Sequence, residues 1–193
     1  GIGTIESCAA HVAIDGQGWV GEFGMFDDRL IPDWQRLAQR VQSHGSLLIG
    51  QAYHGGARSH RAPDRPLPWS CSPSGNGDSE PVRDATPEMI EQTIAGFADA
   101  ARRLAEAGAD GIERHGAHGY LLCQFLSGVL NKRTDEWGGS LENRARLVRR
   151  IMRESKAAAG DGFIVGVRRS PDSSPTVPGL DRDVDVRARL RRG

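Results

Sequence analysis

Three polar side chains each close a short apolar run in this sequence: Gln51, His115 and Arg168. If those runs are parallel strands, their carboxyl ends lie at one edge of a sheet, which is where barrel enzymes place their active sites. Three polar residues at three such positions indicate a site more strongly than any one of them alone. A lone histidine in such a place is more often a hydrogen-bonded structural residue.

The histidines suggest a second chemistry, that of a metal-dependent barrel hydrolase using His54, His60, His115 and His118. No carboxylate pattern and no close ligand spacing supports a metal site, so none is expected. The cysteines number three and are widely spaced, which argues against a metal cage or a disulfide framework. That cysteine usage leads us to expect a reduced, cytoplasmic protein.

Composition narrows the classes of partner. The chain has 193 residues, enough for one domain with a core, and its 25 Lys and Arg balance its 25 Asp and Glu. A net charge of zero gives no electrostatic reason to expect nucleic acid or an anionic membrane as a partner. The longest apolar runs, such as 46–50 and 163–167, are far too short to span a bilayer, and the start does not resemble a signal peptide.

Strands and helices alternate along the chain. Four short runs are typical of buried strands: 3–7, 47–49, 111–115 and 163–167. Helical spacing of apolar residues begins at three places between them: Ile31, Thr86 and Ser140. This alternation predicts βαβ units, a parallel sheet and right-handed crossovers. The long irregular stretch 53–85 is expected to be an active-site loop.

Both an open doubly wound sheet and a (β/α)₈ barrel fit this order of elements. The first strand is not followed by G-x-G-x-x-G, which disfavours a dinucleotide-binding Rossmann domain.

Residues 115–122, 124–126 and 131–146 resemble the NADH:flavin oxidoreductase/Old Yellow Enzyme family almost residue for residue. The resemblance extends to shorter segments on both sides: 5–6, 16–18, 48–51, 54–56, 166–168 and 170–171. It implies an α/β fold, a partial (β/α)₈ TIM barrel with about four parallel strands and flanking helices. We expect residues 1–171 to form this FMN-binding barrel and 172–193, an Arg-rich tail, to be poorly ordered.

By this resemblance, Gln51 hydrogen-bonds the pyrimidine edge of FMN, and Arg168 places positive charge beside the reduced flavin. His115 and His118 bind an oxygen of the substrate, with His115 also counted among the cofactor-binding residues. Tyr120 donates a proton to the carbon opposite the one that takes hydride. The implied reaction is reduction of FMN by NADH or NADPH, followed by reduction of a small activated alkene.

The sequence departs from the family pattern in two ways. By the resemblance, we expect this chain to lack the family's first strand and last three strands, including the phosphate-binding loops that follow strands seven and eight. Arg114 and Arg169 stand where the family has apolar residues, and alternation along a strand points both into the layer between sheet and helices. Such a charge must find partners or reach solvent, because burying it unpaired costs several kcal/mol.

Two other hypotheses stay open. One is an amine dehydrogenase or N-demethylase of the same family. Another is a non-catalytic remnant that cannot retain FMN. In either case a homo-oligomer could cover the open sheet edges.

Overall fold

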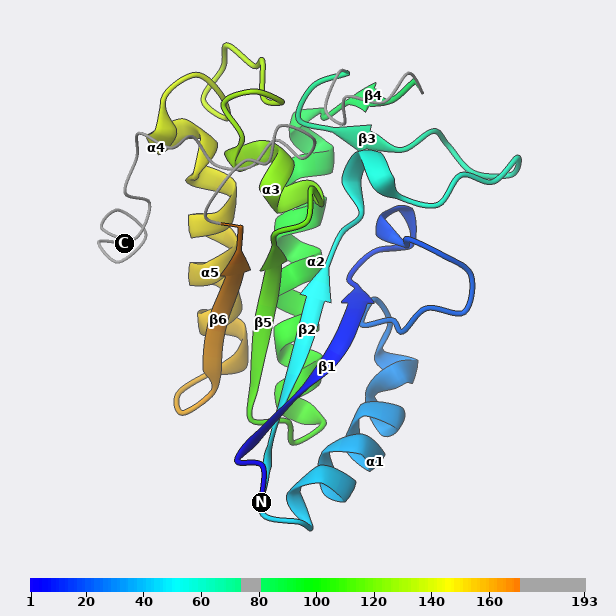
Figure 1. Cartoon of the computed structure of the whole chain (residues 1–193), viewed down its shortest axis with the longest axis vertical. Coiled ribbons are helices and arrows are strands. Elements are labelled where there is room, and N and C mark those ends of the chain that lie inside the picture. Colours follow the sequence, from blue (N-terminus) through cyan, green and yellow to red (C-terminus); the bar gives the residue numbers. More distant parts are fainter. Residues whose placement is uncertain (74–80, 171–193) are drawn as a thin grey trace.

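The computed structural model describes residues 1–73 and 81–170 of the chain. A parallel sheet of four strands forms its centre, in the order β1-β2-β5-β6 (Figure 1). The strands are β1 (Thr4–His11), β2 (Leu47–Tyr53), β5 (Gly111–Gly116) and β6 (Ile164–Arg169). The predicted half-barrel topology is confirmed, because successive strands of the sheet lie side by side and run in one direction.

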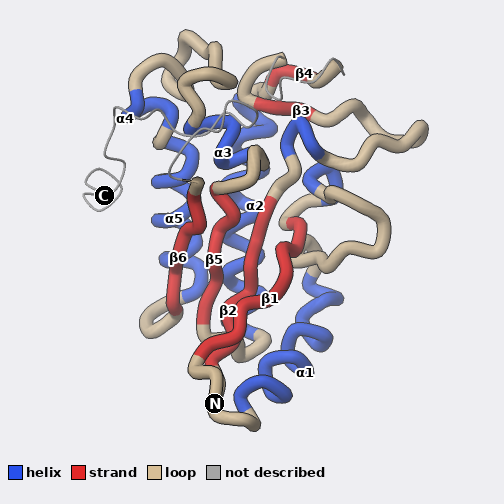
Figure 2. Tube along the Cα trace, viewed as in Figure 1, coloured by secondary structure: helices blue, strands red, loops and turns tan. Residues whose placement is uncertain are grey.

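Helices cover one face of this sheet, and in the described part of the chain no helix covers the other, as Figure 2 shows. The long helices are α1 (Ile31–Gln42), α2 (Pro87–Glu106) and α5 (Arg146–Ala159). Shorter elements are η1 (Ile14–Gly16), η2 (Asp28–Leu30), η3 (Gly56–Arg58), α3 (Leu121–Leu126) and α4 (Leu141–Arg144). A second small sheet pairs β3 (Trp69–Ser70) with β4 (Arg83–Asp84), near the carboxyl ends of the main strands (Figure 1).

The core lies between the sheet and the helices. The apolar stripe of α2 is fully buried there and consists of Ile90, Ile94, Phe97, Ala101 and Leu104. It packs against strand residues and the inner side of α5, and all of these are at most 1% exposed: Leu48, Ala52, Ile112, Leu147, Val148 and Ile151. A side chain at Gly50 would meet Leu104 at 2.6 Å, so glycine here allows β2 and α2 to approach closely.

The starts of α2 and α4 follow the capping rules. The Thr86 hydroxyl accepts a hydrogen bond from the Met89 amide at 3.3 Å, and Pro87 occupies the first turn. Ser140 caps in the same way through the Asn143 amide, but the helix predicted from Ser140 is divided at Ala145 into α4 and α5. The preceding residue, Arg144, is buried and donates to the carbonyls of Leu126 and Gly139, which fixes the chain at this break.

Arg114 is fully buried in the layer between sheet and helices, on the side that alternation predicted. One of its nitrogens, Nη1, donates to the carbonyls of Ile112 and Gly166 at 3.3 and 3.5 Å. Its Nε and Nη2 have no hydrogen-bond partner, and no carboxylate pairs with it among the described residues. Arg169 is only partly buried.

The stretch 53–85 contains η3 and the β3–β4 pair, so it is less irregular than expected. Its residues 74–80 and the expected tail 172–193 lie outside the described residues. Within the described part of the chain, no helix is both long and apolar enough to cross a membrane.

Candidate active site

Gln51 and Arg168 lie on the uncovered face of the sheet and share two carboxylate partners, Glu6 and Glu113. The Gln51 amide nitrogen donates to Glu6 at 2.5 Å and to Glu113 at 2.9 Å. The Arg168 guanidinium donates to Glu113 at 2.6 Å and to Glu6 at 2.7 Å. Four side chains from four strands therefore form one network. Gln51 and Arg168 were predicted, whereas Glu6 and Glu113 were not.

The two carboxylates of this network titrate differently. Burial, reinforced by the neighbouring Glu113 carboxylate, raises the pKa of Glu6. Burial also opposes ionisation of Glu113, but hydrogen bonds with Glu6, Gln51 and Arg168 lower the pKa of Glu113 below its ordinary value. Glu113 is therefore the firmer counter-charge of Arg168, and Glu6 is the first of the pair to take up a proton as the pH falls.

His115, His118 and Tyr120 form a second group at the end of β5. The facing ring nitrogens of the two histidines are 3.1 Å apart, and the Tyr120 ring meets the His115 ring edge-on at 5.0 Å. His118 has a positive φ of 54°, a conformation that turns the chain back toward His115. His115 pairs with Arg168 in the register of β5 and β6. The group of His115, His118 and Tyr120 therefore lies next to the Gln51–Arg168 network, at one edge of the sheet.

His115 is neutral at physiological pH. Burial, together with the neighbouring His118 and Arg168, lowers the pKa of His115 to about 4. A neutral imidazole carries one N–H donor and one acceptor nitrogen. The ring can therefore donate a hydrogen bond to a substrate oxygen without carrying a full charge.

Two further side chains contact this group and were not predicted. The Tyr53 ring meets Tyr120 edge-on at 4.8 Å, and the Arg58 guanidinium lies 5.2 Å from the centroid of the Tyr120 ring. Alternation along β2 could have indicated Tyr53, because it stands two residues after Gln51 on the same face. The sequence carries no comparable signal for Arg58, whose position depends on the fold of η3.

The hydroxyl end of Tyr53 lies in a buried pocket of polar groups. The Glu22 carboxylate, whose side chain is fully buried, accepts from the Gly18 amide at 2.8 Å and lies 3.5 Å from His11. Burial and then this carboxylate raise the pKa of Tyr53 far above its ordinary value. Tyr53 therefore stays protonated, and its ring forms a fixed wall beside Tyr120.

Gln124 of α3 joins the loops that carry these residues. Its side-chain oxygen accepts from the Ala57 amide at 3.2 Å and from the Ser70 hydroxyl at 2.8 Å. Its amide nitrogen donates to the carbonyl of Gly119 at 2.7 Å. The same nitrogen also donates to the Gly55 carbonyl at 3.4 Å, so this fully buried amide makes four hydrogen bonds and holds both loops in one arrangement.

Of the four histidines weighed for a metal site, His115 and His118 contact each other, but no third ligand joins them among the described residues. His54 lies beside Asp15, at 3.4 Å, and Asp15 also accepts from the Trp69 indole at 2.7 Å. Burial opposes ionisation of Asp15, but the hydrogen bonds from His54 and Trp69 lower its pKa to about 2. Among the described residues, no group of three or more His, Cys, Asp or Glu side chains is placed to hold a metal ion.

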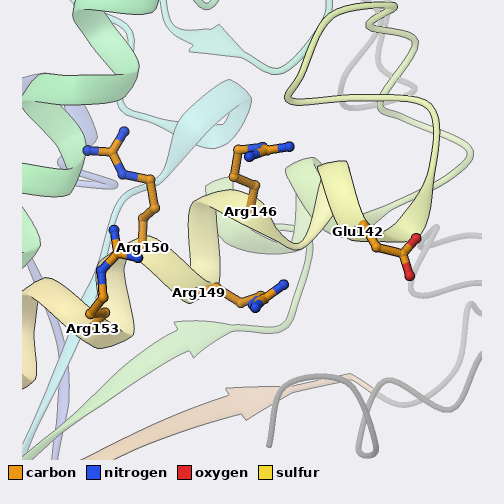
Figure 3. Close-up of a pocket in the computed structure, with 5 residues that line it drawn as sticks. All are labelled: Glu142, Arg146, Arg149, Arg150 and Arg153. Carbon is orange, nitrogen blue, oxygen red and sulfur yellow. The ribbon is translucent and has the colours of Figure 1, made fainter. Parts of the chain in front are cut away.

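A separate hollow of about 270 Å³ lies along α5 and is lined by Glu142, Arg146, Arg149, Arg150 and Arg153 (Figure 3). Its guanidinium groups spread along the helix instead of meeting at one point. Arg150 is already paired with Glu91 and Glu154 and lies over the Trp137 ring. Arginines spaced along one face of α5 therefore account for the hollow better than a ligand site does.

Known proteins are similar to this chain in fold and in sequence. The family described as NADH:flavin oxidoreductase / NADH oxidase matches residues 1–186. A probable NADH-dependent flavin oxidoreductase of Bacillus subtilis, YqiG, is 38% identical over 185 residues, which are 93% of this chain and 49% of the relative. An N,N-dimethylglycine/sarcosine dehydrogenase of Chromohalobacter salexigens is 42% identical over 166 residues, covering 83% of this chain and 24% of the relative.

Among solved structures, morphinone reductase matches with a TM-score of 0.84 and 27% identity, over 92% of this chain and 52% of that one. The chain thus spans about half or less of the relatives that it matches. The family uses FMN with NADH or NADPH as reductant. With a family match that covers nearly all of its residues, the chain belongs to the NADH:flavin oxidoreductase / NADH oxidase family.

Proposed function

We propose that this chain supplies the flavin edge and substrate-binding residues of an FMN-dependent NAD(P)H oxidoreductase that reduces activated alkenes. One observation carries the proposal. The ring nitrogens of His115 and His118 face each other at 3.1 Å with Tyr120 against His115, immediately beside the Gln51–Arg168 network. These two nitrogens are hydrogen-bonded to each other, and a substrate oxygen bound by the histidines would take the place of that bond, with a phenol beside it to supply a proton.

The residues present fit an isoalloxazine ring. Gln51 uses its amide nitrogen on Glu6 and Glu113, while its amide oxygen has no partner among the described residues and remains available as an acceptor. The flavin pyrimidine edge offers N–H and C=O groups, which suit an amide. Arg168 brings a guanidinium to the same place, where it stabilises negative charge on the ring. Gln51, Arg168 and His115 are therefore the proposed cofactor contacts.

FMN, once reduced by NADH or NADPH, supplies the hydride. The chain's own residues do the rest. His115 and His118 hold the activating oxygen of the substrate and withdraw electron density from the alkene. The Tyr120 hydroxyl holds the proton that reaches the second carbon, and Tyr53 keeps the Tyr120 ring in place through their edge-on contact.

Oxidation of a small amine by the same family of barrels is the second candidate. What favours it is the 42% identity to the N,N-dimethylglycine/sarcosine dehydrogenase, higher than the 38% identity to the flavin oxidoreductase YqiG. An amine dehydrogenase would reduce its flavin with N-methylated amino acids and without NAD(P)H. Supplying purified protein with each reductant in turn separates the two activities.

The experiment begins with the absorbance of the purified protein in the flavin bands, before and after addition of FMN. We expect FMN to bind, NADPH or NADH to bleach it, and an activated alkene to restore the colour. Tyr120→Phe should slow re-oxidation by alkene about 100-fold while leaving bleaching by NAD(P)H unchanged. A colourless protein that ignores FMN would instead support a non-catalytic remnant.

We also propose a cytoplasmic location and small molecules as the only substrates. All three cysteines are free, which suits a reducing compartment. Cell fractionation tests the location directly.

A further inference from the structure

Arg58 brings a positive charge to the edge of the proposed substrate site. It ends η3, its Nη1 donates to the His118 carbonyl, and its guanidinium carbon lies 5.2 Å from the centroid of the Tyr120 ring. The side chain is solvent-exposed. Its charge therefore lies beside both His118 and the proposed proton donor.

The charge of Arg58 is uncompensated. Over residues 1–73 and 81–170, no carboxylate lies within ion-pair distance of Arg58, and its interactions are those with the His118 carbonyl and the Tyr120 ring. Arg168, the other guanidinium at this edge, is ion-paired with Glu113 and Glu6. A guanidinium has five N–H donors, so most of those on Arg58 remain available.

The backbone that carries Arg58 is held in place. The amides of Arg58 and Ala57 are bonded to the Gly55 carbonyl, at 3.1 Å, and to the Gln124 side chain, at 3.2 Å. The Gly56 amide donates to the His54 ring at 3.0 Å, and a positive φ of 61° at Gly56 sets the turn. A guanidinium on a fixed loop is preorganised, so little ordering cost is left for ligand binding.

We propose that Arg58 binds a carboxylate of the substrate, so that the favoured substrates are alkenes carrying both an activating carbonyl and a separate carboxylate. The inference rests on the proposed function, because it assumes that His115 and His118 hold the activating oxygen. A planar carboxylate can accept two N–H bonds from the free side of a guanidinium. In the reaction NAD(P)H becomes NAD(P)⁺, and the alkene gains one hydride and one proton across its C=C bond.

The test compares monomethyl fumarate with dimethyl fumarate in the FMN-loaded full-length protein. For Arg58→Gln we expect kcat/KM to fall about 100-fold for the monoacid, mainly through KM, and to change less than about 3-fold for the diester. Arg58→Lys should recover part of the loss, because it keeps the charge but not the forked geometry. Raising the ionic strength should weaken monoacid turnover in the wild type and have little effect in Arg58→Gln.

Arg65→Gln is the matched control. Arg65 lies in the same loop region and donates to the Gln17 side chain at 2.8 Å, away from Tyr120. We expect this variant to keep the monoacid preference of the wild type. Equal losses for both esters in Arg58→Gln would mean that Arg58 only supports the loop, and would overturn the proposal.

A second measurement separates this proposal from the proposed function. Succinate is not an alkene and cannot be reduced, so its binding, followed by perturbation of the flavin absorbance, does not depend on turnover. Saturable binding in the wild type that is lost in Arg58→Gln supports the carboxylate site even if no alkene is reduced. Lack of succinate binding by the FMN-loaded wild type overturns it even if alkenes are reduced.

Discussion

Arg114 is the residue at which burial and charge conflict most strongly. It is fully buried, only one of its nitrogens is hydrogen-bonded, and burial lowers the pKa of its guanidinium. Replacing a poorly compensated buried ion by an apolar side chain of similar length removes the desolvation penalty. We expect Arg114→Met to raise the free energy of unfolding by about 1–3 kcal/mol.

Urea unfolding of the variant beside the wild type measures this change. Arg36→Met is the control, because the Arg36 side chain is 73% exposed and its removal should change stability by less than about 0.5 kcal/mol. A loss of stability in Arg114→Met would show that the two carbonyl contacts of Arg114 outweigh its desolvation.

His115 should make stability depend on pH. In the folded protein burial lowers the pKa of His115 to about 4, whereas an unfolded histidine titrates near about 6.5. Between these values the unfolded chain binds more protons, so this contribution to stability is complete above about pH 6.5 and is lost as the pH falls toward about 4. The loss amounts to about 3 kcal/mol.

Unfolding free energies measured across that pH window test the assignment. The fall should be smaller in His115→Gln than in the wild type, while His44→Gln, at an exposed position, should keep the wild-type slope. Parallel curves for His115→Gln and the wild type would contradict a depressed pKa at His115.

At the scale of elements, the site depends on Gln124 of α3. Gln124→Leu would leave the Ala57 amide, the Ser70 hydroxyl and the Gly119 carbonyl without their buried partner. We expect a loss of about 2–4 kcal/mol in unfolding free energy, since unpaired buried polar groups retain their full desolvation cost. Faster hydrogen exchange at Ala57 should accompany it.

Gln92→Leu provides the comparison for this change, because Gln92 is exposed on α2. Its unfolding free energy should stay within about 0.5 kcal/mol of the wild type. If both leucine variants proved equally stable, Gln124 would not be what joins the two loops.

The apolar periodicity was enough to predict the long helices and the order of strands. Predicted strand ends were less accurate: β2 continues from Ile49 to Tyr53, because Gly50 and Gln51 break the apolar pattern but not the strand. The helix α3 was missed, since all six of its residues are buried and no polar face gives it a period. Such elements are set by tertiary packing, which local sequence does not encode.

For the site, too, local sequence predicted some residues and tertiary packing determined the others. Gln51, His115, His118, Tyr120 and Arg168 were predicted, and the structure brings them to one edge of the sheet. The partners that fix them come from other strands and loops, as Glu6 and Arg58 do. Glu113 could have been found, because a carboxylate inside an apolar strand run needs a partner.

At the scale of the whole molecule, the described part of the chain leaves the sheet with one uncovered face and two edge strands, β1 and β6. On that face, the site lies at the carboxyl ends of the strands and apolar side chains lie at their amino ends. Leu47 is 41% exposed and Ile164 is 46% exposed, and a side chain at Gly111, between their strands, would contact both Ile164 and Ile49. An apolar face of this kind is stable only when something covers it.

We therefore expect the 193-residue chain to self-associate through this face, with a weight-average mass in sedimentation experiments that rises with protein concentration. The double variant Leu47→Lys/Ile164→Lys should shift this rise to concentrations at least about 10-fold higher, because charges would have to be desolvated on association. Val129→Lys is the control, since Val129 is equally apolar and 58% exposed but lies in the loop after α3. A monomeric wild type at every concentration would show that another part of the molecule covers the face.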